Sequence, residues 1–221
     1  MQLFISRLFS DNPADRFYFF AVVVTVVISI VLHELAHGWA AMRLGDPTPR
    51  TQGRMTGNPL VHMGPFSLVA LALVGIAWGQ MPIDPSRMRG RYAGAWVAAA
   101  GPAMNLLLAV AALTGLAVLV RFGPTGADAS GGIAGVLDNA TQLLSIAGTL
   151  NLVLMGFNLM PAPPLDGSRI LADFSRGYEQ FAFNPAQPGV GLLLFFGAFL
   201  LVQPMFEFAT RVAAWYVGLL L

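Results

Sequence analysis

The pentapeptide His33-Glu34-Leu35-Ala36-His37 lies within residues 17–42, which contain no other Asp, Glu, His, Lys or Arg. Because a helix needs about 20 mainly apolar residues to cross a bilayer, residues 17–42 predict a membrane-spanning helix. A charged or strongly polar side chain inside such a helix costs a few kcal/mol to insert. Three of them together indicate a bound ligand, so the fold and the function both depend on this pentapeptide.

The spacing of the two histidines suits a metal ion. Residues i and i+4 of a helix lie one turn apart on the same face, so His33 and His37 can bind one metal between them. Glu34 lies beside them, where it can take a proton from a water molecule that the metal activates. The alternative is that the three side chains only form hydrogen bonds between helices. Glu34 would then need a cationic partner, and no Lys or Arg lies inside a predicted span.

The composition places the whole chain in the membrane class. It is 56% hydrophobic and 10% charged, whereas an ordinary soluble domain has about 25% charged residues. The chain has no cysteine, which excludes disulfides and thiolate ligands, so a metal must be bound by His, Asp, Glu or Asn. The net charge is +1 and no tract of basic residues occurs. We therefore expect the lipid bilayer, and no nucleic acid, as a partner.

Four further apolar segments have lengths relevant to a membrane. Residues 92–120 and 142–160 each predict a span. Residues 189–202 are short and could span if the helix is extended or tilted. Residues 205–221 follow Pro204 and predict either a short span or an amphipathic helix at the membrane surface.

Residues 65–80 are apolar but short for a span, and their flanks decide between a full crossing and a re-entrant segment. Positive charge marks the cytoplasmic side of a membrane. Three arginines precede the segment and three follow it, so both flanks are predicted to be cytoplasmic and the segment is predicted to dip in and return. The arginines are Arg43, Arg50, Arg54, Arg87, Arg89 and Arg91.

The charge pattern then predicts a single topology. The loop 122–141 has no basic residue and is predicted to lie outside, whereas Arg169 and Arg176 follow the 142–160 span and are predicted to lie inside. The helices 17–42 and 142–160 therefore both run inward. Their ends are expected to meet on the cytoplasmic face, which a full crossing by 65–80 would prevent.

A third metal ligand is expected in the segment that follows the 142–160 span, since a catalytic zinc site usually has three protein ligands. Pro161 ends regular helix by removing a backbone donor, and the next prolines keep the chain extended. Gly167 allows a tight approach of the backbone. The segment is therefore expected to place Asp166 beside the end of the first helix. Non-helical backbone at this depth of the membrane is tolerated only where protein or a water-filled cavity surrounds it.

These motifs resemble those of the site-2 protease family of intramembrane zinc metalloproteases. The matching features are His-Glu-Leu-Ala-His at 33–37, Gly-Pro-Ala-Met-Asn at 101–105, and residues 158–167 with their Leu-Asp-Gly. Their order and their placement on helices also match, and the resemblance covers about residues 20–172.

The resemblance implies one zinc ion per chain, bound by His33, His37 and Asp166, with Glu34 as the general base. It also implies an active site that faces the cytoplasm, which agrees with the charge pattern. Asn158 is the candidate donor to the oxyanion that develops during hydrolysis, because an amide donates without adding charge. Asn105 is the weaker candidate, and both amides could instead tie helices together.

Residues 45–62 resemble the compact prokaryotic branch of the same family, which implies a multi-pass protein of a prokaryotic cell membrane. Members of that branch often have an acidic residue followed by proline shortly after the histidine, whereas this chain has Met63-Gly64-Pro65. We therefore interpret His62 as a structural or solvated residue.

The predicted fold is an all-α polytopic membrane protein with one domain over residues 1–221. Its catalytic core covers about 17–172 and its C-terminal helices cover about 189–221. Residues 79–85 are expected to line the substrate cleft and could form a small membrane-associated β element. Prolines suit an edge strand, and an edge strand can bind an extended peptide.

The predicted function is hydrolysis of peptide bonds in transmembrane or membrane-anchored proteins by zinc-activated water. Two other classes remain as alternatives. A catalytically idle membrane adaptor would be free to lose Glu34, and a metal transporter would need ligands along a path rather than at one depth. The sequence leaves the substrate and the oligomeric state open.

Overall fold

The computed structural model describes residues 3–123 and 132–221, and within them the regular structure is helical, without a β-strand. Three helices are long and apolar enough to cross a membrane, and a bent pair adds up to a fourth span. This confirms the prediction of an all-α membrane fold. The long helices are α1 (Pro13–Arg43), α5 (Ala93–Phe122) and α6 (Gly132–Asn158), and the bent pair is α9 (Pro188–Phe199) with α10 (Val202–Leu220).

Shorter elements connect these helices. They are η1 (Phe4–Phe9), α2 (Thr48–Thr51), α3 (Pro59–His62), α4 (Gly64–Val74), η2 (Pro85–Arg87), α7 (Asp166–Phe174) and α8 (Arg176–Ala182).

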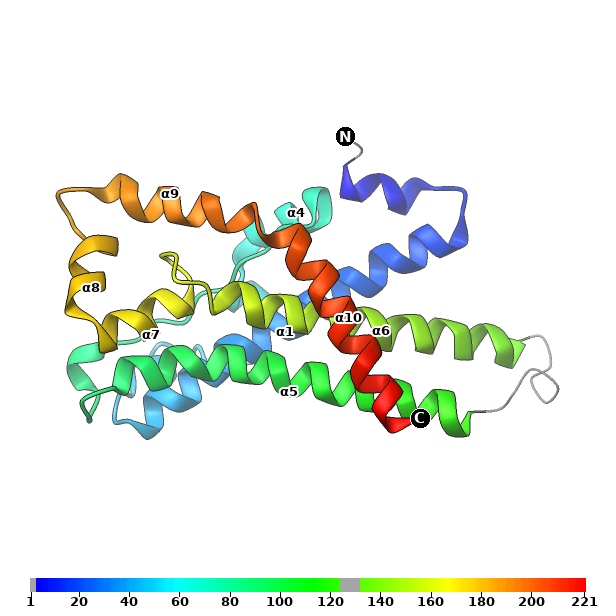
Figure 1. Ribbon diagram of the computed structural model, residues 1–221, viewed down its shortest axis with the longest axis horizontal. Helices are drawn as coiled ribbons and strands as arrows, with labels where there is room; N and C mark the ends of the chain where they lie inside the picture. Colours follow the sequence, from blue (N-terminus) through cyan, green and yellow to red (C-terminus); the bar gives the residue numbers. More distant parts are fainter. Residues whose placement is uncertain (1–2, 124–131) are drawn as a thin grey trace.

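The first long helix, α1, is the interior element of the bundle. Asn12 caps its N-terminus by accepting a hydrogen bond from the Ala14 N–H, and Pro13 occupies the first turn, where its missing donor costs nothing. Its apolar window is 67% buried, against 28% for α5 and 17% for α6. Figure 1 shows α5 and α6 running side by side, with α10 crossing over both of them. The polar residues in the middle of α1, among them His33, Glu34 and His37, are therefore enclosed by protein.

The chain reverses direction after α4, as the re-entrant prediction requires. Gly75 ends the helix in the left-handed region, with φ of +78°. The Ser67 hydroxyl then accepts from the Trp78 N–H at 2.9 Å and donates to the Trp78 carbonyl at 2.7 Å. The Gln80 N–H donates to the His62 carbonyl at 3.0 Å. Residue 80 thus lies beside the start of the dip, which a full crossing would not allow.

The returning segment, residues 76–84, has no regular secondary structure and pairs with no strand among the described residues. The β element that the sequence left room for is therefore not formed there. The segment is instead attached at its end to the loop after α1. The fully buried Asp46 accepts from the Thr48 N–H at 2.9 Å and from the Asp84 N–H at 2.7 Å. Beyond it, the Arg89 N–H donates to the Leu44 carbonyl at 2.8 Å.

These hydrogen bonds also set the charge state of Asp46. Its burial opposes ionisation, but the hydrogen bonds from Thr48 and Asp84 outweigh burial and hold the pKa of Asp46 below its usual value. The carboxylate is therefore ionised at neutral pH and joins the end of α1 to the returning segment.

Two element boundaries differ from the prediction. Helix α6 begins at Gly132 rather than near 142, because weakly polar residues continue the helix beyond the apolar run. Residues 124–131 of the predicted outer loop lie outside the described residues. Pro204 lies within the first turn of α10, where proline is tolerated, rather than before the helix. The Thr114 hydroxyl on α5 pairs with that of Tyr216 on α10 at 2.9 Å, so α10 packs on the bundle.

Candidate metal centre

The two histidines of α1 face one another inside the bundle. Their Nε2 atoms are 3.0 Å apart, and both side chains are buried. The Nδ1 atom of His33 lies 2.6 Å from the Asn105 side-chain oxygen, and that of His37 lies 2.7 Å from the Val97 carbonyl oxygen. Because oxygen acceptors face both Nδ1 atoms, each neutral imidazole carries its hydrogen on Nδ1. Both Nε2 atoms are then left with a free lone pair.

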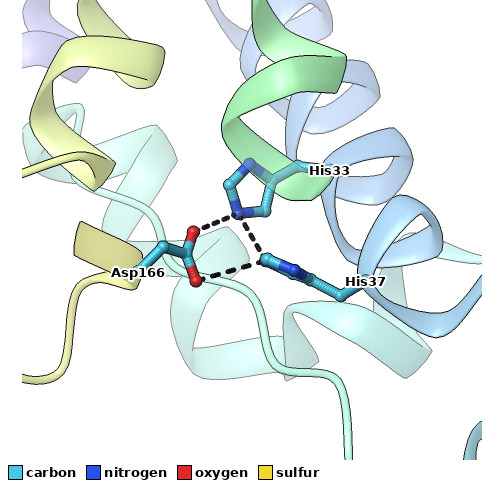
Figure 2. Close-up of side chains that lie close together, drawn as sticks. All are labelled: His33, His37 and Asp166. Carbon is cyan, nitrogen blue, oxygen red and sulfur yellow. Dashed lines mark hydrogen bonds and ion pairs between the residues drawn. The ribbon is translucent and has the colours of Figure 1, made fainter. Parts of the chain in front are cut away.

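Asp166 completes the cluster from a different part of the chain, as Figure 2 shows. It is the first residue of α7, and its two oxygens lie 3.1 Å from Nε2 of His33 and 3.4 Å from Nε2 of His37. Gly167 makes this position possible, since a Cβ there would lie 2.0 Å from the Leu159 carbonyl oxygen. The expected tight approach at Gly167 is therefore present.

The donor set fits a zinc ion. One ligand atom from each of His33, His37 and Asp166 lies within 4.8 Å of the others. The two imidazole nitrogens and the carboxylate offer lone pairs to one another but no hydrogen. Among the residues that the structure describes, the buried Oδ2 of Asp166 has no hydrogen-bond partner. A cation satisfies such a set, and Zn²⁺ binds His nitrogen and carboxylate oxygen. Gly101 keeps the space clear, since a Cβ there would lie 2.4 Å from the His33 Nε2.

Glu34 lies against the returning segment. Its side chain is buried, and a Cβ on Gly79 would lie 2.5 Å from its Oε1. The backbone at Gly79 therefore passes directly over the carboxylate. This places the expected base between the cluster on α1 and the segment that was predicted to line the substrate cleft.

The three other polar residues singled out from the sequence have different surroundings. The Asn158 amide donates to the Leu154 carbonyl one turn back in α6, at 2.9 Å, and makes no hydrogen bond to the cluster among the described residues. Asn105 does reach the cluster, where its side-chain oxygen contacts Nδ1 of His33. His62 is 2% exposed and its Nε2 donates to the Thr56 carbonyl at 2.7 Å, which agrees with a structural rather than a solvated residue.

Two groups at the site were not found from the sequence. The Val97 carbonyl that faces His37 is a backbone group, so no side chain could reveal it. Asn151, which hydrogen-bonds to Asn105, was not distinguished from the other polar residues of α6. A buried asparagine two turns before Asn158, in an apolar stretch, is the signal that could have found it.

Comparison with known proteins gives a consistent family. Peptidase family M50 matches residues 20–129. The chain is 39% identical to a Bacillus subtilis protein named "Putative zinc metalloprotease YwhC", over 72% of this chain and 74% of that protein. It is 32% identical to "Putative zinc metalloprotease Rip2" of Mycolicibacterium smegmatis, over 76% of this chain and 62% of that protein. It is 25% identical to "Zinc metalloprotease MJ0392" of Methanocaldococcus jannaschii, of which it covers 48%. No solved structure matches the chain.

Proposed function

Because the chain belongs to peptidase family M50, the site-2 protease family, we propose that it is an intramembrane zinc metalloendopeptidase. It hydrolyses peptide bonds of transmembrane or membrane-anchored proteins, within or near their spans. It acts as a multi-pass protein of a prokaryotic cell membrane, and the arginine-rich flanks of the dipping segment support an active site that faces the cytoplasm.

One observation carries this proposal. Two imidazole lone pairs and a carboxylate converge inside a helix bundle, with a glutamate beside them. His33, His37 and Asp166 would hold one zinc ion per chain. A zinc ion bound there supplies Lewis acidity, which polarises a carbonyl group and lowers the pKa of water toward about 7. Burying Glu34 without such a cation would be costly, because no arginine forms an ion pair with Glu34 among the described residues.

The protein's own groups then have distinct tasks. Glu34 takes the proton from the attacking water and passes it to the departing amine. Asn158 donates to the oxyanion that develops on the substrate carbonyl. An amide nitrogen has two hydrogens, so the bond from Asn158 to the Leu154 carbonyl leaves one of them free.

The returning segment offers the place for an extended peptide. A cavity of about 440 Å³ lies along its end, lined by residues 82–85 and by Thr48, Thr51, Gln52 and Arg87. The backbone groups of this segment that make no hydrogen bond among the described residues can form main-chain hydrogen bonds with an unwound substrate. A photo-crosslinker at Met81 or Ile83 should capture a substrate there. A label that reacts only with water would contradict this role.

The test compares the wild type with Glu34→Gln after reconstitution with a single-span substrate. We expect stoichiometric zinc in both proteins and a fall in cleavage of about 100-fold or more in Glu34→Gln, as loss of a general base predicts. Glu207→Gln changes an exposed carboxylate on α10 and should cleave as the wild type does. Wild-type protein without stoichiometric zinc, or unchanged cleavage by Glu34→Gln, would overturn the proposal.

A further inference from the structure

A chain of hydrogen bonds leads from α6 through α5 to His33 on α1. The Asn151 amide nitrogen donates to the Ala147 carbonyl at 2.9 Å, and the Asn151 oxygen accepts from the Asn105 amide nitrogen at 3.0 Å. The Asn105 oxygen in turn faces Nδ1 of His33 at 2.6 Å. Asn105 is 1% exposed and Asn151 is 2% exposed, so water does not compete with these hydrogen bonds.

The Ala147 carbonyl fixes the orientation of both asparagine amides in this series of hydrogen bonds. The Ala147 carbonyl can only accept a hydrogen bond, so Asn151 must turn its NH₂ toward Ala147 and its oxygen toward Asn105. Asn105 must then turn its own NH₂ toward Asn151 and its oxygen toward His33. Reversing either amide would place oxygen against oxygen at one end. His33 therefore meets an acceptor and must hold its hydrogen on Nδ1.

The close approach of α6 to α5 makes the chain possible. Gly148 lies one turn before Asn151, and a Cβ there would lie 2.4 Å from the Leu113 Cδ2 on α5. A larger residue at 148 would push the two helices apart. Asn151, Gly148 and Val153 are the buried residues of α6, so Asn151 lies on the narrow face that meets α5.

We propose that Asn151 is a positioning residue of the metal centre, which acts through Asn105 to hold His33 in the tautomer that presents the Nε2 lone pair. This inference rests on the proposed zinc site. It also gives Asn105, considered above as the weaker oxyanion donor, a role in orienting His33 through its side-chain oxygen.

The competing explanation is that the two asparagines only hold α5 and α6 together. Interhelical hydrogen bonds in membrane proteins contribute modestly to stability. That role would affect stability and leave the metal affinity unchanged. Groups that orient a metal-bound histidine typically change the metal affinity 10- to 100-fold when they are lost. The two roles therefore differ in a measurable quantity.

The experiment measures the zinc dissociation constant of purified protein by competition with a chelator, together with the absorption spectrum of the Co²⁺-substituted protein. Asn151→Leu removes both ends of the amide. Asn151→Asp, buried between apolar helices and therefore protonated, can still donate to the Ala147 carbonyl and accept from Asn105. Thr114→Val is the matched control, because it removes an interhelical hydrogen bond between α5 and α10 that does not reach the metal centre. If Asn151→Leu does not fold, Asn151→Ala serves in its place.

We expect Asn151→Leu and Asn105→Leu to weaken zinc binding about 10- to 100-fold and to shift the Co²⁺ spectrum. Asn151→Asp and Thr114→Val should remain close to the wild type. Zinc binding by Asn151→Leu that equals that of the wild type, or an equal loss in Thr114→Val, would overturn the inference while leaving the zinc site intact. Wild-type protein that binds no zinc would instead overturn the proposed function itself.

Discussion

The two histidines of the metal centre differ in what holds them. The Nδ1–H of His37 donates to a backbone carbonyl, that of Val97, which no substitution can delete. The Nδ1–H of His33 donates to a side chain, Asn105, which a substitution can delete. The orientation of His33 is therefore the adjustable half of the site. We expect substitutions that weaken zinc binding without touching a ligand to cluster around His33.

Gly101 tests the shape of the metal centre directly. A Cβ there would lie 2.4 Å from Nε2 of His33 and 2.5 Å from Nε2 of His37. Gly101→Ala should therefore abolish stoichiometric zinc and cleavage, measured by metal analysis of the purified protein. Gly115→Ala is the control on the same helix, because its Cβ would meet Leu144 at an ordinary 3.6 Å. Full zinc content in Gly101→Ala would mean that the helices are further apart than described.

Gly79 tests the contact between the base and the returning segment. A Cβ there would lie 2.5 Å from Oε1 of Glu34, so Gly79→Ala must displace either the carboxylate or the segment. We expect cleavage to fall about 10-fold or more while the zinc content is unchanged, since an ångström-scale displacement can cost about 100-fold in rate. Gly57→Ala, in an exposed loop with no atom within 4 Å of its Cβ, should behave as the wild type. Equal rates in the two variants would show that the segment does not constrain Glu34.

At the scale of the helices, α1 and its motif could be predicted from the sequence because hydropathy and the i, i+4 spacing are local properties. The arrival of Asp166 from the end of α6 was also accessible, because the prolines at 161–164 mark where that helix ends. Asn151 was not, because α6 is mostly exposed to the membrane and hydropathy does not show which of its faces meets α5. The missing strand at 79–85 has a similar cause, since proline-rich extended sequence does not show whether a partner strand exists.

Asp46 tests how the returning segment is held. Asp46→Asn replaces an acceptor with an NH₂ group that meets a backbone N–H of Thr48 or Asp84. Leaving a buried donor without an acceptor costs about 1–3 kcal/mol. We expect faster proteolysis near 82–88 and a lower midpoint of thermal unfolding in detergent. Asp11→Asn, an exposed carboxylate before α1, is the control. Identical proteolysis of the Asp46 variant and the wild type would contradict the attachment.

The same carboxylate predicts a pH dependence. Burial opposes ionisation of Asp46, but the hydrogen bonds from Thr48 and Asp84 leave its pKa in the folded protein below the usual value of 3.8. A lowered pKa stabilises the folded state above the unfolded pKa, and this stabilisation is lost as the pH falls through the folded pKa. The difference in unfolding midpoint between the wild type and Asp46→Asn should therefore be constant at neutral pH and shrink below about pH 4. A difference that shrinks already near pH 6 would point to another group.

At the scale of the molecule, the polar groups and the apolar surface are separated. His33, Glu34 and His37 of α1 are buried, whereas large apolar side chains such as Trp96, Leu193 and Leu200 are exposed. Exposed apolar surface of this extent suits contact with lipid acyl chains. The candidate metal centre thus lies inside protein, within a bundle whose outer surface carries large apolar side chains.

The topology can be tested cleanly because the chain has no cysteine. Single-cysteine variants at Gln52, Ser86 and Gly132, all exposed, can be labelled in sealed cells with a membrane-impermeant maleimide. If the segment 65–80 dips and returns, Gln52→Cys and Ser86→Cys should both resist labelling until the membrane is permeabilised. Gly132→Cys, at the opposite end of the bundle, should react at once. If only one of Gln52→Cys and Ser86→Cys reacts before the membrane is permeabilised, residues 65–80 cross the bilayer. The ends of α1 and α6 would then lie on different faces, and Asp166 could not meet the two histidines.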